Sequence, residues 1–320
     1  MSTVGLLRFV ALRVLGGIIL ILVVAFIVFL AVSILPGDAA TAVLGRNATP
    51  ERVAALQEKM NLDQPLPLRF GSWLSGVLHG NLGTSLTSDR DVWSLLGPRL
   101  FNSLILACLA ALVIVPVGIV LGAISGSRAG SVRDRGVSVS SLILLSIPEF
   151  VLGAALITVL AIWTGWLPPV SLFNPEDGPM SSPQVLVLPV LTLVLTNLGY
   201  VARIVRASVA RSMDGEVVKM ARLNGYPERQ VVWGYSLRNS LAPSIQVSAL
   251  VVLYLISGVV VVETVFQYPG IGQLALEATT NRDFVLLQSL VVVATAIFVL
   301  VNIVTDLLIV LVTPRLRTAL

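Results

Sequence analysis

Long apolar stretches separated by shorter polar segments dominate this chain of 320 residues. A helix needs about 20 consecutive apolar residues to cross the hydrocarbon core of a bilayer. Six stretches are close to that length or exceed it, at residues 9–35, 99–125, 137–163, 185–205, 244–262 and 284–312. The pattern therefore predicts an all-α integral membrane protein with about six transmembrane helices.

The composition supports this prediction. Hydrophobic residues make up 56% of the chain and charged residues only 12%, whereas a soluble domain carries roughly 25% charge. Such a chain cannot cover itself with a water-compatible surface, so contact with membrane lipid is expected. The net charge of +4 does not indicate nucleic-acid binding, because the bases flank apolar stretches instead of forming a stripe with aromatic residues.

The charges between the apolar stretches predict the orientation. Arginines gather in the segments that follow the second and fourth stretches, whereas acidic residues dominate those that follow the third and fifth. Because cytoplasmic loops carry the excess of Lys and Arg, both termini are predicted to be cytoplasmic (N-in, C-in). The expected organisation is then an N-terminus with the first helix (1–35), an extracytoplasmic insertion between helices 1 and 2 (36–98), and a core domain (99–320).

The residues that most enzymes and metal sites require are scarce. The only histidine is His79, in the expected outer insertion, so histidine metal clusters and serine–histidine catalysis lack their parts. The two lysines, Lys59 and Lys219, do not complete a phosphate-binding loop. The single Cys108 cannot form a disulfide framework within the chain. We therefore expect no catalytic residue, no metal site and no cofactor in this chain.

Two acidic residues, Glu149 and Asp306, lie inside apolar stretches. A charge in the middle of a bilayer is costly, so each should face a bundle interior, water or an interface. A proton-coupled carrier is one interpretation of the pair, and contacts in helix packing or with a partner are the other. Pro148 precedes Glu149 and could open the helix toward a cavity.

A polar, basic segment at residues 203–243 interrupts the apolar pattern. Asp214 and Glu216 suit the first turn of a helix, Gly225 suits its C-terminal cap, and Pro227 suits the start of a second helix. The segment is thus predicted to form two helices about an elbow. A docking surface for a soluble partner is one interpretation, and an amphipathic helix pair on the membrane surface is the other.

Short motifs inside and outside this segment carry a family resemblance. Ala221-Arg-Leu-Asn-Gly225 followed by Leu237-Arg-Asn-Ser-Leu-Ala-Pro243 resembles the "EAA" coupling loop of binding-protein-dependent ABC importer permeases. The likeness is greatest to the first ("B") transmembrane subunit of the dipeptide, oligopeptide and nickel branch. Further motifs of that branch occur in the same order: Leu35-Pro-Gly-Asp38, Leu62-Asp-Gln-Pro65, Gly80-Asn-Leu-Gly83 with Ser85, Ser146-Ile-Pro148, Gly165-Trp-Leu-Pro168 and Val262-Glu-Thr-Val-Phe-Gln-Tyr-Pro-Gly270.

The resemblance implies roles for particular residues. Contact with the ATPases is expected of the loop residues Glu216, Ala221, Arg222, Gly225, Arg238, Asn239 and Pro243. The translocation path or its gate is expected at Pro148, Glu149, Phe150 and Glu263. The loop departs from the usual motif at Lys219-Met220 and at Leu223-Asn224, so the coupling role rests on the remaining positions.

The resemblance also implies a function. The chain would be a permease subunit of an ATP-driven, binding-protein-dependent peptide importer in a prokaryotic inner membrane, and would form half of the translocation path. Its partners would be a homologous second permease, two ABC ATPase domains that carry ATP and Mg²⁺, and an extracytoplasmic binding protein that delivers the peptide. A nickel or other small-solute importer is the alternative, followed by a proton-coupled secondary carrier.

Overall fold

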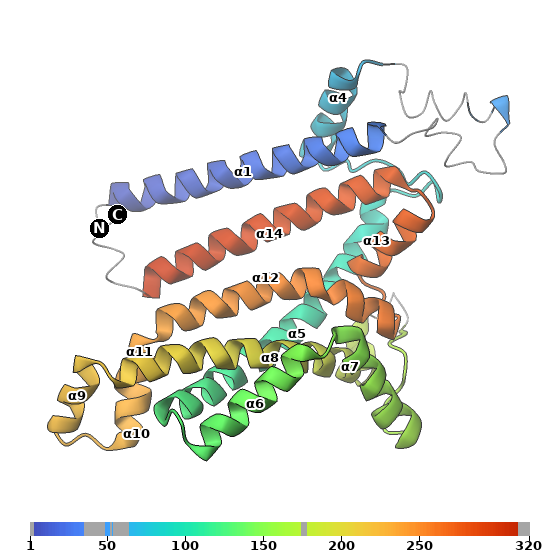
Figure 1. Cartoon of the computed structure of the whole chain (residues 1–320). Helices are drawn as coiled ribbons and strands as arrows, with labels where there is room; N and C mark the ends of the chain where they lie inside the picture. The colour runs from blue at the N-terminus through green and yellow to red at the C-terminus, as the bar shows by residue number, and fades with distance from the viewer. Residues whose placement is uncertain (1–2, 35–48, 52, 54–63, 174–177, 313–320) are drawn as a thin grey trace. The chain divides into compact units, whose positions relative to one another are not determined.

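The computed structural model describes residues 3–34, 49–51, 53, 64–173 and 178–312. Within these ranges the chain folds into helices joined by turns and short irregular segments, with one isolated antiparallel bridge between Thr84 and Asp91 (Figure 1). The motif that begins at Leu35 and the first half of the one that begins at Leu62 lie outside the described residues. The predicted all-α architecture is confirmed.

Helices that could cross a membrane form most of the described chain. Four are long and apolar enough, and up to six spans result if each of two bent helix pairs is one span. The four helices are α1 (Thr3–Ile34), α5 (Val92–Ser127), α8 (Gln184–Met213) and α14 (Phe284–Val312). They cover the first, second, fourth and sixth predicted stretches.

The third predicted stretch is broken. The sequence predicts one span over 137–163, whereas the structure has α6 (Val132–Ser146), then α7 (Glu149–Leu156) continued by a π-helix, η2 (Ile157–Trp163), with a bend of 100° between the two parts. Pro148 causes the break, because its ring disfavours helical backbone at the preceding residue and it has no N–H to donate. Ile147 is accordingly extended, with φ −92° and ψ 122°.

The fifth predicted stretch lies within α12 (Leu241–Phe266), which ends at Gln267 in left-handed backbone with φ 52°. After a short turn, α13 (Ile271–Thr280) follows at an angle of 78° to the end of α12. The sequence analysis did not predict α13, since its ten residues are too few to register as a span.

The chain divides into two compact units, and each has its own hydrophobic core. The first is built around Asn102–Pro269, and α8 is its central helix, packed against α6, α7 and α12 (Figure 1). Its buried core includes Ile114, Leu193 and Leu255. This unit contains both sites described below.

A row of glycines brings α5 close to α8 within the first unit. Gly118, Gly122 and Gly126 are spaced four residues apart, so they share one face of α5. A Cβ atom at Gly122 would lie 2.6 Å from the Cβ of Val205 and 2.7 Å from the carbonyl oxygen of Ala202. Small residues at this spacing allow two backbones to approach in a membrane.

The second unit comprises Ala11–Phe101 and Gly270–Leu300. Asp283 joins two segments of this unit. Its carboxylate accepts hydrogen bonds from Ser85 Oγ at 2.5 Å and from the backbone N–H of Leu86 at 3.2 Å. It also caps the first turn of α14 through the backbone N–H of Leu286, at 3.1 Å. Ser85, which the sequence analysis noted only as a motif residue, thus anchors the segment before α5 to the start of α14.

A short amphipathic helix, α4 (Leu66–Leu78), also belongs to the second unit. Its Phe70 and Trp73 rings pack against Phe29 of α1, with ring centroids 5.3 Å and 6.0 Å from that of Phe29. His79 is the C-cap residue of α4, and a nitrogen of its ring lies 2.7 Å from the carbonyl oxygen of Ser75. The only histidine therefore has a local structural contact.

Candidate functional site

The polar segment between α8 and α12 folds as two helical parts. We call residues 216–243 the elbow segment. It comprises α9 (Glu216–Leu223), a turn, and a helical run made of α10 (Glu228–Gln230), the π-helix η4 (Val231–Ser236) and α11 (Leu237–Asn239), which leads into the first residues of α12. The predicted helix–elbow–helix is confirmed.

Gly225 makes the turn between the two parts. Its φ is +76°, a left-handed conformation that glycine adopts without strain. The backbone N–H of Gly225 donates to the carbonyl of Arg222, and that of Tyr226 donates to the carbonyl of Ala221. These two bonds form a Schellman motif, which ends α9 and sets the direction of the following chain. A substitution at Gly225 would meet backbone strain and no clash, because the space around it is open.

The inward face of the elbow segment is anchored in the core of the first unit. Val218 and Ala221 of α9 are buried, as are Val231 and Val232 of η4. The hydroxyl of Ser212, at the end of α8, donates a hydrogen bond of 3.2 Å to the carbonyl of a residue in η4. A displacement of the elbow would therefore act directly on the end of α8.

The outward face of α9 is apolar and exposed. Val217, Met220 and Leu223 follow one another at three-residue spacing, so they form a stripe on one side of the helix. Their exposed fractions are 49%, 61% and 83%, rising toward the elbow. An exposed apolar patch with charged residues around it marks an interaction surface. The sequence analysis noted Met220 and Leu223 only as departures from a motif, and it missed that they share this face.

An ion pair spans the elbow. Nη2 of Arg222 lies 2.7 Å from an oxygen of Glu228, which joins α9 to α10. The hydrogen bond from Arg222 lowers the pKa of the Glu228 carboxyl below its usual value, and the same bond raises the pKa of the Arg222 guanidinium. Within α9, Glu216 pairs with Lys219 at 3.1 Å.

The remaining predicted coupling residues lie at the C-terminal end of the segment. Arg238 and Asn239 are exposed on α11, and Pro243 is half-buried in the first turn of α12. Ala221 differs from the other predicted contact residues, because its side chain faces the core of the protein itself. We conclude that its small size serves the internal packing of α9.

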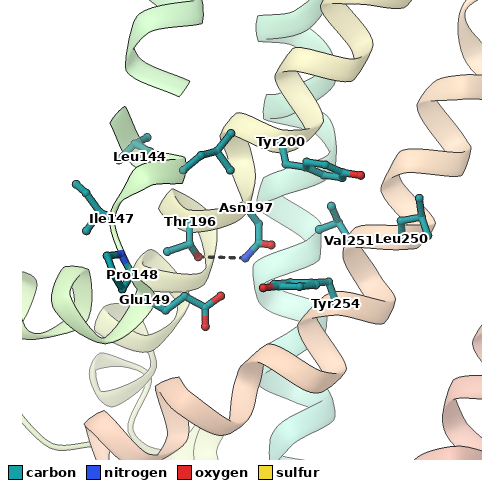
Figure 2. A pocket seen from close by; sticks show the side chains of 11 residues that line it. Leu144, Ile147, Pro148, Glu149, Thr196, Asn197, Tyr200, Leu250, Val251 and Tyr254 are labelled. Carbon is teal, nitrogen blue, oxygen red and sulfur yellow. Dashed lines mark hydrogen bonds between the residues drawn. The ribbon is translucent and has the colours of Figure 1, made fainter. Parts of the chain in front are cut away.

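A second feature of the first unit is a cavity of about 590 Å³ at the break between α6 and α7. Pro148 and Glu149, two of the residues expected at the translocation path or its gate, line it together with residues of α8 and α12. Phe150 is exposed and is not among the lining residues. Figure 2 shows the Glu149 carboxylate directed into this space.

Glu263 does not line the cavity. Its side chain is fully buried near the end of α12 and accepts a hydrogen bond from Ser103 Oγ of α5. Nearby, Tyr268 Oη donates to the carbonyl of Asn102 at 2.8 Å, and the Asn102 amide donates to the carbonyl of Pro269 at 2.9 Å. These bonds tie the end of α12 to α5, so the structure assigns Glu263 a place in internal packing.

Comparison with known families removes one of the alternatives. Residues 118–318 match the family described as "Binding-protein-dependent transport system inner membrane component". Residues 6–107 match the N-terminal part of the membrane component of binding-protein-dependent transport systems. The chain belongs to this family. Its members are non-catalytic, multi-pass inner-membrane subunits without a cofactor, and their systems include ATPase and binding-protein subunits. Membership excludes the proton-coupled secondary carrier.

Several permeases are similar to this one along its whole length. A probable peptide ABC transporter permease of Sinorhizobium fredii is 34% identical over 305 residues, which are 95% of this permease and 97% of that protein. A putative peptide transport system permease of Brucella abortus is 33% identical with the same coverage. A glutathione transport system permease of Salmonella choleraesuis is 32% identical over 98% of this permease and 99% of that protein.

Proposed function

We propose that this permease is one of two homologous transmembrane subunits of a peptide importer. Its relatives of nearly full-length similarity carry the names of peptide and glutathione permeases. The complete importer would contain a second permease, two ABC ATPase domains and an extracytoplasmic binding protein. This chain would supply half of the translocation path through six spans, if the bent helix pairs each count as one.

The elbow segment is the surface that receives the ATPase. The observation that carries this proposal is the exposed stripe of Val217, Met220 and Leu223, which lies on the outside of a helix whose other face is buried in the permease core. ATP-driven movement of a partner bound to the stripe would be transmitted through α9 to α8. The residues of this segment transmit force and perform no covalent chemistry.

The orientation follows from the charges. The segments at residues 128–135 and 203–238 both carry an excess of basic residues, which favours the cytoplasmic side. Both termini are then cytoplasmic, and the insertion at 36–98 faces outward, toward the binding protein. A cytoplasmic elbow segment is also the arrangement that gives a cytoplasmic ATPase access to it.

Reconstitution of the complete transporter tests this function. We expect proteoliposomes that contain both permeases and the ATPases to accumulate radiolabelled trialanine only when ATP and the binding protein are both supplied. Active ATP hydrolysis without peptide uptake, together with uptake of ⁶³Ni²⁺ by the same vesicles, would refute the peptide assignment in favour of the metal-importing alternative. Failure of the ATPases to co-purify with the permeases would refute the coupling assignment.

A further inference from the structure

The cavity beside Glu149 lies half-way along a membrane-crossing helix. Its residues from α8 occupy positions 196–200, near the middle of Gln184–Met213. Half-way along a span, a broken helix is tolerated where it lines a cavity or packs against protein, and broken helices at this depth commonly form transport sites. The volume of about 590 Å³ lies within the range of small-molecule sites. The lining residues are Leu144, Leu145, Ile147, Pro148, Glu149, Thr196, Asn197, Tyr200, Leu250, Val251 and Tyr254.

Two polar side chains on the α8 side of the cavity have already used their donors. Asn197 Nδ2 donates to the carbonyl of Leu193 at 2.9 Å and to Thr196 Oγ1 at 3.1 Å. The Thr196 hydroxyl in turn donates to the carbonyl of Thr192 at 2.9 Å. The carbonyl oxygen of the Asn197 amide remains as an acceptor. The Asn197 amide at this wall therefore favours a ligand that donates hydrogen bonds.

Glu149 adds a negative charge to these acceptors. Its half-buried carboxylate belongs to the first residue of α7, where the helix dipole stabilises an anion. Among the residues that the structure describes, it has no hydrogen-bond or ion-pair partner. The cavity lining contains no Lys, Arg or His. A carboxylate at this depth is costly without a counter-charge, and the transported ligand can provide one.

Two tyrosines complete a site for a cation. Figure 2 shows the rings of Tyr200 and Tyr254 on the side of the cavity opposite Pro148, with the Tyr254 hydroxyl directed toward the Glu149 carboxylate. Tyrosine rings attract cations through their faces, and a tyrosine hydroxyl can also accept a hydrogen bond. Ile147, Leu250 and Val251 make the rest of the wall apolar.

We propose that this cavity is a subsite for the primary ammonium group of the peptide in transit, with Glu149 as its counter-ion. Asn197 Oδ1 and the Tyr254 hydroxyl supply the remaining acceptors. The proposal deepens the proposed function and rests on it, since it names the group of the transported peptide that this permease recognises. The ammonium can come from the peptide N-terminus or from a lysine side chain, and both present the same three donors.

Uptake by the complete reconstituted transporter tests the proposal. Wild type is compared with Glu149→Gln, which removes the charge and preserves the shape of the side chain. Three substrates are compared: trialanine, its desamino analogue propionyl-Ala-Ala, which lacks only the ammonium group, and acetyl-Ala-Lys-Ala. Each rate is divided by the amount of peptide-loaded binding protein, so that the preference of the binding protein cancels. Glu51→Gln serves as the charge-matched control, because Glu51 is exposed and does not line the cavity.

We expect Glu149→Gln to lower trialanine uptake about tenfold, since charged hydrogen bonds are the strong ones, while any uptake of propionyl-Ala-Ala stays at the wild-type rate. An equal loss of acetyl-Ala-Lys-Ala uptake would show that a lysine side chain can also supply the ammonium group. The proposal would be overturned if Glu149→Gln took up trialanine at more than half of the wild-type rate. Equal losses of uptake for trialanine and propionyl-Ala-Ala would overturn it as well. Absence of uptake in the wild type, with active ATPases, would instead refute the peptide function itself.

Discussion

Arg206 of α8 donates two parallel hydrogen bonds to the carboxylate of Asp134 of α6, and the one from Nη2 is 2.6 Å long. Asp134 is almost fully buried, and it also accepts bonds from Ser125 Oγ at 2.6 Å and from the backbone N–H of Gly130 at 2.7 Å. One carboxylate therefore fixes the end of α5, the turn after it and the start of α6 onto α8. Because α8 leads into the elbow segment, this pair also determines the position from which α9 starts.

Loss of this carboxylate should destabilise the permease. We expect Asp134→Ala to cost about 3 kcal/mol, the lower end of the range for a broken buried pair, because Arg206 remains one-third exposed. The melting temperature of the purified complex measures the effect. Arg203→Ala removes an exposed arginine one turn away and should change the melting temperature little. Equal shifts for the two variants would contradict the role assigned to Asp134.

A single methyl group added at the contact between α5 and α8 should destabilise the permease. Gly122→Ala places a Cβ within 2.7 Å of the α8 backbone at Ala202, so the helices must separate, and overpacking of this kind costs about 1–3 kcal/mol. Gly136→Ala is the matched control, because its Cβ would meet open space and alanine favours a helix. We expect a lower melting temperature for the first variant only. A normal melting temperature for Gly122→Ala would show that the helices are not so closely packed.

The exposed stripe should be needed for binding of the ATPase and not for folding. We expect Leu223→Ser to reduce the amount of ATPase that co-purifies with the permeases several-fold, while the melting temperature of the permease part is unchanged, because the Leu223 side chain is 83% exposed. Leu78→Ser, at a leucine at the end of α4 that is 76% exposed, is the control. Undiminished co-purification of the ATPase with Leu223→Ser would remove the stripe from the contact.

The ion pair across the elbow predicts a defined pH dependence. The pKa of Glu228 is lowered in the folded state, so the unfolded state binds more protons in the acidic range and stability rises with pH there. The contribution is complete above the usual carboxyl value of 4.5 and is lost as the pH falls through the lower folded-state pKa. Both side chains are substantially exposed, so the effect is small, about 0.5 kcal/mol.

Amide hydrogen exchange in residues 216–230 measures this contribution. At pH 7 we expect Glu228→Gln to exchange about twofold faster than wild type in this segment. When the pH is lowered below the folded-state pKa of Glu228, the difference should disappear, because the wild-type carboxylate is then protonated as well. A difference that persists unchanged at low pH would show that the ion pair is not its cause.

Much of the helical architecture follows from the sequence, because a bilayer demands long apolar helices and the chain has few other long apolar segments. The bend of 100° at Pro148 did not, since the apolar pattern runs through it without interruption. The sequence indicated only that Pro148 could open the helix. Glu149 was recognisable as a charge in an apolar stretch, but its companions Asn197 and Tyr254 lie on helices that are apolar on most sides. Periodicity cannot indicate which face of such a helix lines a cavity.

Contacts between residues that are distant in the sequence could not be predicted either. Asp134 and Arg206 are 72 residues apart, and in the sequence each is one of several charges that merely flank apolar stretches. The elbow itself was predictable, because Gly225 and Pro227 are strong local signals. The apolar stripe on α9 was not recognised, because its exposure depends on which face Val218 and Ala221 bury.

In the proposed importer, the elbow segment transmits the work of the ATPases to peptide translocation. Gly225→Val tests it most directly, because valine at a φ of +76° is strained and should redirect the chain after α9. Gly234→Ala is the control, since its nearest neighbour is a flexible side chain atom at 3.7 Å. The measurement is the number of trialanine molecules taken up per ATP hydrolysed in proteoliposomes. We predict that Gly225→Val still assembles in the membrane but lowers this ratio at least tenfold, whereas an undiminished ratio would contradict the account.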